Sequence, residues 1–579
     1  MKSILLFVFR PQLLLSLLFL CLCVGAVRAQ APTWQTAIAN TGSGSCVVNA
    51  TATDANGNVY IAGRFGGIVT FGSTTLDASP PRNICAFVAK WSNATKSFVW
   101  AQQSVSVRGY DEAKSIAVSG TNIYLAGAFN GGAISFGNLT LINKGSFSDD
   151  AFVVKLTDAG VSSTFTWAQQ IGGVSSESAY GIAANGSNVY VAGSFSTPTS
   201  FGTIVLPGSG SSDVYVAKIM DAGATGSFIW AQSGGSSTGS EEARSIAVSG
   251  TSVYITGSFY GITSTFGNVT LTNSSNPGIY EVYVAKLTDA GTTGNFVWAQ
   301  SAGGTKSDIA YGITAQGNSV YVVGEFQGPT ATFGTTTLTT TDSNLDLFVA
   351  KLTDAGATGS FAWAQRAGGS EYDNAHAVAV QGNNVYITGE FRQTADFGPY
   401  TLTATGSIGA SDVFVAKLTD LGNNGAFSWV QQGGGPSYDY SGALAVQGSV
   451  IYVGCTVSPP ASFGNIPNVG NPNGSFTSVL ASLSDVVLAT HNTLTKASFA
   501  VYPNPANAST TIQIPAVANA TQATLTLTDA LGRQVRTQSL RLQATGTMVE
   551  LPLRNLAPGV YRLCVQFGTQ QAAQALLIQ

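Results

Sequence analysis

The sequence predicts an all-β protein: a seven-bladed β-propeller of four-stranded antiparallel blades, closed by an N-terminal strand and followed by a small Ig-like β-sandwich. Three repeating columns carry this prediction. A tryptophan recurs every 63 to 68 residues, and each unit also holds one Phe-Gly pair and one Tyr-x-x-Gly motif. In the seventh of these motifs Cys455 replaces the glycine. The tryptophans are Trp34, Trp100, Trp167, Trp230, Trp298, Trp363 and Trp429. Three columns with the same count indicate seven structural units.

The first 29 residues have the pattern of a secretory signal peptide. Lys2 and Arg10 precede an apolar run at 13–26, and small residues around Ala29 offer a cleavage site. The alternative is a membrane anchor, but the run is short for a span. No later segment is long and apolar enough to cross a bilayer, so we expect no transmembrane span in the mature chain.

Each unit contains four short strand-like runs separated by turn residues. In the sixth unit these runs are residues 375–380, 385–389, 413–418 and 427–430. Runs of this length bounded by Gly, Asn and Asp form hairpins, and the Phe-Gly segment is an insertion between the second and third strands. The Asp-x-Gly triplets, such as the one at Asp158, are expected to form turns in the third hairpin.

A radial arrangement buries both faces of every sheet and leaves no open edge. The last unit lacks a tryptophan-bearing fourth strand, whereas residues 33–39 carry Trp34 ahead of the first complete unit. We therefore expect this N-terminal segment to supply the outer strand of the last blade. The tryptophans are expected to pack between neighbouring blades, where each indole buries a large apolar area.

The repeated motifs are similar to those of a known family. Stretches such as "DNAHAVAVQGNNVYITGEF", together with the F-G-x-x-x-L and D-x-F-V-A-K-L columns, resemble the seven-bladed propeller repeats called SBBP repeats, over residues 32 to about 485. This resemblance implies the fold but no particular function.

Two acidic columns are the candidate metal ligands. They precede the first and third strands of the units, and these two strand starts lie on one face of an up-and-down sheet. Carboxylates on such a rim are candidate calcium ligands; the alternative is that they cap loop N–H groups or pair with the lysines of the third strands, Lys90 among them. The first column is Asp111, Glu177, Glu241, Asp308, Asp373 and Asp439, and the second is Asp150, Asp213, Glu281, Asp346 and Asp412.

Three cysteines depart from the repeat and map to the same acidic face. An exported protein meets oxidising conditions, so Cys46 is a candidate for a disulfide with either Cys85 or Cys455. A zinc site has less support because no CxxC spacing accompanies these residues.

The sequence offers no catalytic constellation and no cofactor motif. His376 and His491 are the only histidines, and neither lies in a nucleophile or metalloprotease motif. We interpret His376 as a loop or strand residue. Only 9% of residues are charged and the net charge is −4, so no basic surface for nucleic acid or anionic membrane is indicated.

The C-terminal segment has a different composition. Residues 486–498 lack the blade columns and form a predicted linker, and residues 499–579 show the strand pattern of a small β-sandwich. This segment resembles the type A C-terminal sorting domain of the type IX secretion system of Bacteroidetes, which implies that the secretion machinery is a partner. The residues that carry the resemblance are Tyr502, Pro503, Asn504, Pro505, Asp529, Gly532, Arg533, Pro558, Gly559, Val560 and Tyr561.

Together these patterns predict a secreted or outer-membrane cell-surface binding module with an extracellular glycan or protein ligand, and not an enzyme. Two alternatives remain open: an extracellular enzyme that acts on polysaccharide or glycoprotein through a loop-built site, and a structural surface-layer component. An enzyme needs one blade with distinctive polar residues, whereas these blades are nearly uniform in sequence.

Overall fold

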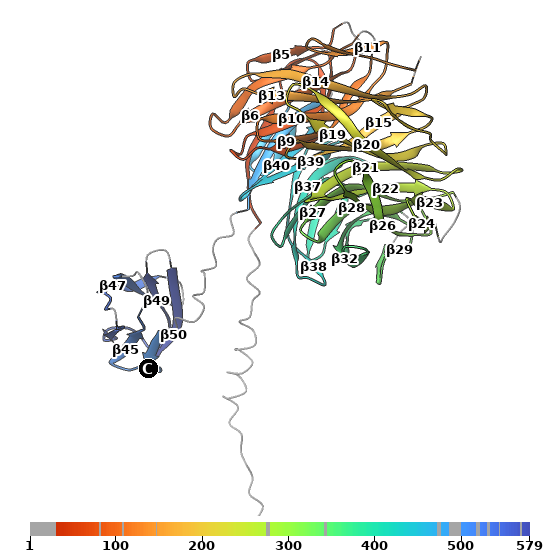
Figure 1. Ribbon diagram of the computed structural model, residues 1–579. Coiled ribbons are helices and arrows are strands. Elements are labelled where there is room, and N and C mark those ends of the chain that lie inside the picture. Colours follow the sequence, from red (N-terminus) through yellow and green to blue (C-terminus); the bar gives the residue numbers. More distant parts are fainter. Residues whose placement is uncertain are drawn as a thin grey trace, which may run out of the picture. The chain divides into compact units, whose positions relative to one another are not determined.

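In a computed structural model the propeller consists of four-stranded antiparallel blades (Figure 1), and in all but the last blade the strands follow the order of the chain. The structure describes residues 31–79, 83–106, 109–145, 148–273, 278–340, 344–471, 476–485, 499–516, 521–529, 533–543, 545–567 and 570–579, and no helix occurs among them. The predicted signal peptide, the predicted linker 486–498 and Gly532 lie outside these residues. The chain divides into two compact units, up to Asp485 and from Val486.

The innermost strands form a closed ring, in which each contacts its neighbours and the last, β39, contacts the first, β2. We name each blade by its innermost strand. These strands are β2 (Ser45–Thr53), β9 (Asp111–Ser119), β15 (Glu177–Asn185), β21 (Ser240–Ser249), β27 (Asp308–Gln316), β33 (Asn374–Gln381) and β39 (Tyr440–Gln447).

The second and third strands form the buried middle of each blade. The second strands are β3 (Val59–Gly66), β10 (Asn122–Phe129), β16 (Asn188–Phe195), β22 (Ser252–Tyr260), β28 (Ser319–Gln327), β34 (Asn384–Arg392) and β40 (Val450–Val457). The third strands are β6 (Cys85–Ser92), β13 (Asp150–Asp158), β19 (Asp213–Asp221), β25 (Tyr280–Asp289), β31 (Leu345–Asp354), β37 (Ser411–Asp420) and β43 (Thr477–Ser484).

The outer strands carry the repeated tryptophans. They are β7 (Ser97–Gln103), β14 (Ser163–Gly172), β20 (Gly226–Gly235), β26 (Gly294–Gly304), β32 (Gly359–Gly369), β38 (Gly425–Gly434) and β1 (Trp34–Ala39). As predicted, the N-terminal strand β1 completes the last blade: it pairs antiparallel with β43, with Ala37 opposite Ala481. In Figure 1 the blue β40 accordingly lies beside the orange strands of the first blade.

Each Phe-Gly insertion forms a hairpin that joins two blades. Its first strand pairs with the outer strand of the preceding blade, as Phe201 does with Ile171, or with β8 (Val105–Ser106), which follows β7. At the closing blade, Thr41 bridges to Thr70. The hairpins are β4–β5 (Ile68–Phe71, Thr74–Asp77), β11–β12 (Ala133–Phe136, Leu139–Ile142), β17–β18 (Thr199–Phe201, Ile204–Leu206), β23–β24 (Thr263–Phe266, Val269–Thr272), β29–β30 (Thr330–Phe333, Thr336–Thr339), β35–β36 (Thr394–Phe397, Tyr400–Thr403) and β41–β42 (Ala461–Phe463, Ile466–Val469).

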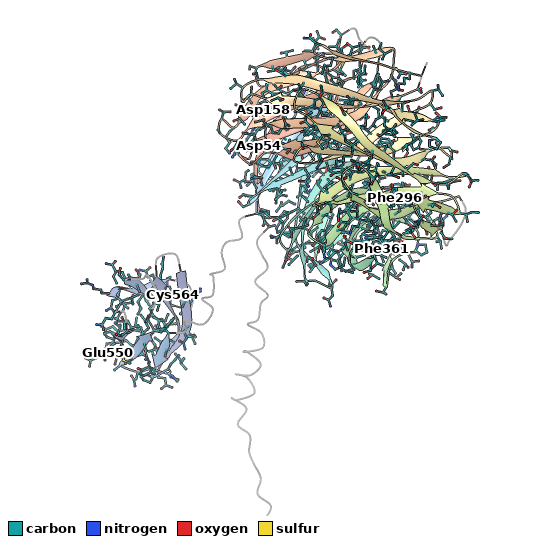
Figure 2. All side chains as sticks on the ribbon, viewed as in Figure 1. Asp54, Asp158, Phe296, Phe361, Glu550 and Cys564 are labelled. Carbon is teal, nitrogen blue, oxygen red and sulfur yellow. The ribbon has the colours of Figure 1, made fainter. Side chains whose placement is uncertain are left out.

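The hairpin phenylalanines fill the space between blades. Phe266 packs 5.5 Å from the ring of Phe296, and Phe333 packs 5.5 Å from Phe361; Phe296 and Phe361 are labelled on their outer strands in Figure 2. The backbone of each hairpin thus pairs with one blade while its phenylalanine ring packs on the next, which buries the interface from both sides.

The C-terminal unit is a sandwich of two antiparallel sheets around one apolar core. Alternate residues of β46, such as Leu525 and Leu527, are buried while their neighbours are less so, which is the period-two pattern expected of a sandwich strand. One sheet holds β44 (Ala500–Tyr502), β45 (Ser509–Ile514) and β48 (Thr547–Pro552); the other holds β46 (Gln522–Thr528), β47 (Gln534–Arg541), β49 (Gly559–Phe567) and β50 (Gln570–Ile578).

Candidate functional site

The two acidic columns meet in pairs across the boundaries between blades. An acid before the third strand of one blade faces the acid before the first strand of the next, and each such pair is electrostatically coupled. All are buried, with at most 3% of each residue exposed. The pairs are Asp150 with Glu177, Asp213 with Glu241, Glu281 with Asp308, Asp346 with Asp373, and Asp412 with Asp439.

These carboxylates cap loop N–H groups. Oδ2 of Asp373 accepts a 2.7 Å hydrogen bond from the backbone N–H of Gly369, and Oδ1 accepts one from Arg392. Asp308 and Asp439 are bonded in the same way, so capping is observed directly. Among the described residues, no three His, Cys, Asp or Glu side chains are grouped so that they could hold a metal ion. Calcium binding by these acids stays a hypothesis that competes with capping.

Burial raises the pKa of acids that face one another across a blade boundary. Burial raises the pKa of Asp373 to about 8, and the neighbouring carboxylate of Asp346 adds to the effect. Burial likewise raises the pKa of Asp308 to about 8, with a contribution from Glu281. Two carboxylates so placed resist simultaneous ionisation, so each of these pairs retains a proton near neutral pH.

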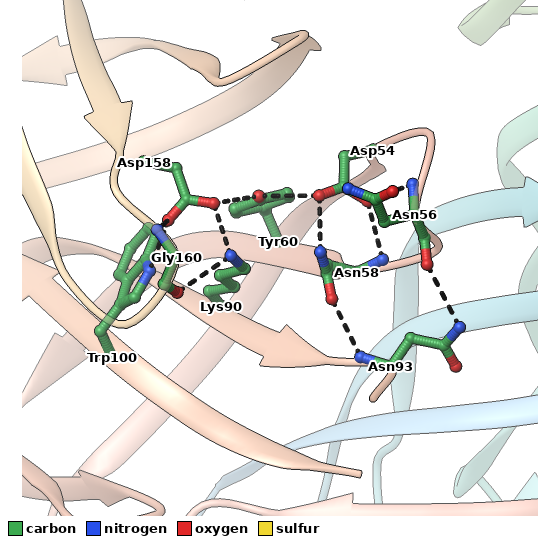
Figure 3. A network of polar contacts seen from close by, with 9 residues as sticks. All are labelled: Asp54, Asn56, Asn58, Tyr60, Lys90, Asn93, Trp100, Asp158 and Gly160. Carbon is green, nitrogen blue, oxygen red and sulfur yellow. Dashed lines mark hydrogen bonds and ion pairs between the residues drawn. The ribbon is translucent and has the colours of Figure 1, made fainter. Parts of the chain in front are cut away.

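The lysines of the third strands pair with aspartates of the next blade and not with the acids of the two columns. Lys90 Nζ lies 2.5 Å from Oδ2 of Asp158 in the turn of the next blade, and the same aspartate accepts hydrogen bonds from Tyr60 and Trp100 (Figure 3). As predicted for the Asp-x-Gly turns, Oδ1 of Asp158 also accepts the N–H of Gly160, whose φ is 92°. The tryptophans therefore do mark the boundaries between blades.

Five further aspartates repeat this arrangement around the ring. Each accepts from a tyrosine, a lysine and a tryptophan of the preceding blade. The sets are Asp221 with Tyr124, Lys155 and Trp167; Asp289 with Tyr190, Lys218 and Trp230; Asp354 with Tyr254, Lys286 and Trp298; Asp420 with Tyr321, Lys351 and Trp363; and Asp485 with Tyr386, Lys417 and Trp429.

Neither predicted disulfide is formed, and Cys46, Cys85 and Cys455 are free, buried thiols. Cys46 and Cys85 both lie opposite Phe65, one on each side of β3. Two strand spacings separate them, roughly 9–10 Å, which exceeds the Cα separation that a disulfide spans. Cys46 and Cys455 belong to different core clusters.

The innermost strands enclose a cavity of about 640 Å³ in the central channel. Every one of these strands carries a β-bulge at the same position, where one residue has no partner on the second strand. A bulge re-aims the side chain that it carries. The bulge residues are Asn49, Lys114, Tyr180, Arg244, Tyr311, His376 and Gly442, and all of them line the cavity.

On one side of the cavity, two carboxylates bind bulge residues that line it. Nε2 of His376 lies 2.9 Å from Oε1 of Glu390, and the hydroxyl of Tyr311 donates a 2.9 Å hydrogen bond to Glu325. The rings of His376 and Tyr311 lie 4.8 Å apart, and Cζ of Arg244 lies 5.2 Å from the Tyr311 ring. These five side chains form one contiguous polar cluster.

The opposite side is organised by Glu112 of β9. It accepts hydrogen bonds from Asn49 and Lys114 and pairs with Arg64 of β3. Although burial raises the pKa of Glu112, Lys114 and Arg64 outweigh it and lower the pKa overall. Nζ of Lys114 also lies 5.2 Å from the ring of Tyr180, a cation–π contact.

The titration of the first cluster follows from its charges. Burial lowers the pKa of His376, but the carboxylate of Glu390 outweighs burial and the pKa is raised overall. Burial raises the pKa of Glu325, and Glu390 adds to the effect. His376 therefore holds a proton more readily than a free imidazole does.

The channel residues were missed by sequence reasoning, which took the blades as nearly uniform and His376 as structural. A signal is present in the sequence: in "DEAKS", "ESAYG", "EEARS", "DIAYG" and "DNAHA" the first letter is always acidic and the third always Ala, whereas the fourth is Lys, Tyr, Arg, Tyr or His. The fourth letter is the bulge residue in each case. The bulge residues therefore give the channel a chemically asymmetric wall.

The predicted motif residues of the C-terminal unit stabilise its strand ends. Asn504 donates to the carbonyl of Ala575 and accepts the N–H of Leu577, which ties it to β50. Arg533 pairs with Asp529 at 2.8 Å, and the hydroxyl of Tyr561 donates to the carbonyl of Ala557.

Comparison with known families identifies the C-terminal unit. Residues 500–579 match the family of secretion system C-terminal sorting domains, which confirms the predicted sorting domain at this end of the chain. A search of curated protein sequences finds no match. Within the residues that the structure describes, no helix is long and apolar enough to cross a membrane.

Several solved structures are similar at low identity. A Trypanosoma rangeli sialidase in complex with sialic acid shares 10% identity over 91% of this chain and 83% of that chain, with a TM-score of 0.28. A mutant of that sialidase displaying trans-sialidase activity shares 9% over 94% and 89%, with a TM-score of 0.32. A glycoside hydrolase family 32 structure from Bifidobacterium adolescentis shares 9% over 92% and 76%, with a TM-score of 0.23. At these TM-scores the likeness supports no functional argument.

Proposed function

We propose that this protein is a secreted or cell-surface β-propeller of the SBBP type that binds an extracellular ligand in its central channel. A signal peptide at 1–29 takes it through the first membrane, and the C-terminal sorting domain engages the type IX secretion machinery. The observation that carries the binding role is the column of bulge residues, because a purely structural repeat has no need for large polar side chains of varied chemistry, Lys, Arg, His and Tyr among them, at the same channel position.

The side chains of the channel suit an anionic or hydroxyl-rich ligand. Lys114 and Arg244 supply cationic donors, His376 supplies an imidazole, and Tyr180 and Tyr311 supply aromatic faces with a polar tip. Such groups fix the orientation of a ligand. Extracellular glycans and acidic peptides both present complementary groups.

Binding by the purified secreted protein to an array of acidic and neutral oligosaccharides and peptides tests this role. Arg244→Gln and Tyr311→Phe should each weaken binding by about tenfold, because each removes a hydrogen-bonding group from the channel. Lys306→Gln is the matched control, since Lys306 is an exposed cation outside the channel. Unchanged binding by both channel variants would refute a channel ligand.

The export role is tested separately in cells. Removing residues 500–579 should leave the propeller intact, because the propeller has its own core. The truncated protein should remain on the periplasmic side of the outer membrane. Surface labelling and cell fractionation report the outcome. Normal surface display of the truncated chain would show that this domain does not direct export.

The same cavity favours a second candidate, an enzyme acting on polysaccharide or glycoprotein. Glu325 and Glu390 are both largely buried, and Oε2 of Glu390 has no hydrogen-bond partner among the described residues. In glycoside hydrolysis, two carboxyl groups whose environments give them different pKa values act as general acid and as base or nucleophile. Release of reducing ends that is abolished by both Glu325→Gln and Glu390→Gln, with ligand binding retained, would establish this activity.

A further inference from the structure

The rim between the β33 and β39 blades carries an arginine flanked by two exposed tyrosines. Cζ of Arg392 lies 5.2 Å from the centre of the Tyr372 ring and 5.6 Å from that of Tyr438. The two tyrosines are 39% and 44% exposed. Each immediately precedes the buried acid that caps the first strand of its blade, a position held by serine in most other blades.

Fixed loops hold this cluster in place. The backbone N–H of Arg392 donates to Asp373, the neighbour of Tyr372. Tyr438 forms a parallel bridge with Ser411, the residue opposite Arg392 on β37. All three side chains therefore stand on backbone that is bonded to the blade edges, and their arrangement is preorganised.

The residue after Arg392 adds a further constraint. Gln393 has a φ of 51°, in the left-handed region, where glycine stands at the corresponding positions Gly67, Gly131, Gly261 and Gly328. A non-glycine residue there is strained. In return, the Gln393 side chain donates a hydrogen bond to Glu371, next to Tyr372. Blade β33 thus departs from the repeat in a way that fixes the tyrosine loop beside the arginine.

The guanidinium of Arg392 is left available. Among the described residues, no ion pair includes it, whereas Arg64, Arg244 and Arg366 are each paired with a carboxylate. The nearby Glu371 accepts the hydrogen bond of Gln393 instead. An arginine without a carboxylate presents a planar fork of N–H donors that matches a carboxylate bidentately.

We propose that Tyr372, Arg392 and Tyr438 bind a uronate residue of an acidic polysaccharide at the mouth of the channel. The sugar carboxylate pairs with the guanidinium, and the C–H faces of its pyranose rings pack on the exposed tyrosine rings, whose faces are negatively polarised. This inference deepens the proposed function and rests on it, since it names the ligand class of the channel.

Continuity along one strand links the rim to the channel. Glu390 and Arg392 are two residues apart on β34, so their side chains leave the same face of the strand. Glu390 contacts the channel residue His376, and Arg392 reaches the rim tyrosines. A linear polysaccharide bound at His376 would reach the rim cluster by extending along β34.

Titration of the purified protein with oligogalacturonates, followed by calorimetry, tests this proposal. Their methyl esters are the uncharged control, and hexaglutamate is the acidic peptide control. Arg392→Gln should lower the affinity for oligogalacturonate about tenfold or more and abolish the preference over the methyl ester, and Arg392→Lys should restore little because it lacks the fork. Tyr372→Ala should weaken the binding of both the oligogalacturonate and its methyl ester.

Two control variants keep the outcome interpretable. Tyr260→Ala removes an exposed tyrosine, and Lys306→Gln an exposed cation, from blades that lack this cluster; both should bind as the parent does. Loss of binding in Tyr311→Phe but not in Arg392→Gln would leave the channel site standing and overturn the rim site. Loss in Arg392→Gln alone would support the rim site and count against the channel. Equal binding of hexaglutamate, or no oligogalacturonate binding at all, would overturn the uronate proposal.

Discussion

Nε1 of Trp230 donates a 3.1 Å hydrogen bond to Oδ1 of Asp289, which belongs to the following blade. The other oxygen of Asp289 lies 2.7 Å from Nζ of Lys218, so one carboxylate satisfies an indole and a buried ammonium at once. Burial raises the pKa of Asp289, but Lys218 and the other donors outweigh it and lower the pKa overall. The blades are therefore joined by ionised aspartates as well as by apolar packing.

Replacing Asp289 by Asn should destabilise the propeller by about 3 kcal/mol, because it leaves the Lys218 charge buried without its partner. Thermal unfolding followed by circular dichroism measures this change. Asp396→Asn is the control: Asp396 is exposed and accepts a hydrogen bond from Thr401, so its replacement should change the stability by no more than about 0.5 kcal/mol. Equal melting temperatures for the two variants would contradict the role assigned to Asp289.

The closing strand should be essential for a monomeric ring. Trp34 is 7% exposed, packs edge-on at 5.0 Å from Phe463 and donates to the carbonyl of Gln432. Trp34→Ala should cost about 3–5 kcal/mol, whereas Gln35→Ala on the exposed side of the same strand should have little effect. Deleting residues 31–40 should expose the edge of β43 and cause aggregation. A deleted chain that stays monomeric and melts as the parent does would disprove closure by this strand.

Stability should decrease as the pH rises from about 5 to about 8.5. Glu241, Asp308 and Asp373 have their pKa raised to about 8 by burial and by a facing acid. Their contribution is fully present below the ordinary carboxyl pKa and is lost as the pH rises through the folded value. Asp158 and Asp289, whose pKa is lowered, act oppositely and lose their contribution only in acid.

Melting temperatures of the parent and of Asp373→Asn at both pH values check this dependence. The variant mimics the protonated acid and should lose part of the decrease, while Asp396→Asn should retain all of it. A parent protein that is more stable at about pH 8.5 than at about pH 5 would contradict the assignment.

Calcium should leave the melting temperature unchanged. The oxygens of Asp308, Asp373 and Asp439 already accept backbone N–H groups, so a calcium ion would have to displace these caps to reach them. Calorimetric scans in EDTA and in excess calcium give the comparison. A rise of several degrees with calcium would instead support the calcium ligands that the acidic columns suggest.

Much of the fold is determined locally and was therefore accessible from the sequence. Alternating apolar residues bounded by Gly, Asn and Asp specify short strands and hairpins wherever they occur, and repetition of the same local pattern specifies the ring. The pairing of the segment around Trp34 could be predicted because the last unit lacked an outer strand and this segment had no unit of its own. The sorting domain was identified differently, through the resemblance of residues such as Tyr561 to a known family.

What the tertiary structure decided depends on distances between residues far apart in the chain. Lys90 and Asp158 meet only because successive blades are packed side by side, and Cys46 and Cys85 are kept apart because β3 lies between them. His376 and Tyr311 enter the channel because a bulge turns them inward. A period-two pattern in the sequence does not reveal such a break in register. The tertiary structure was therefore needed to identify the residues of the candidate site.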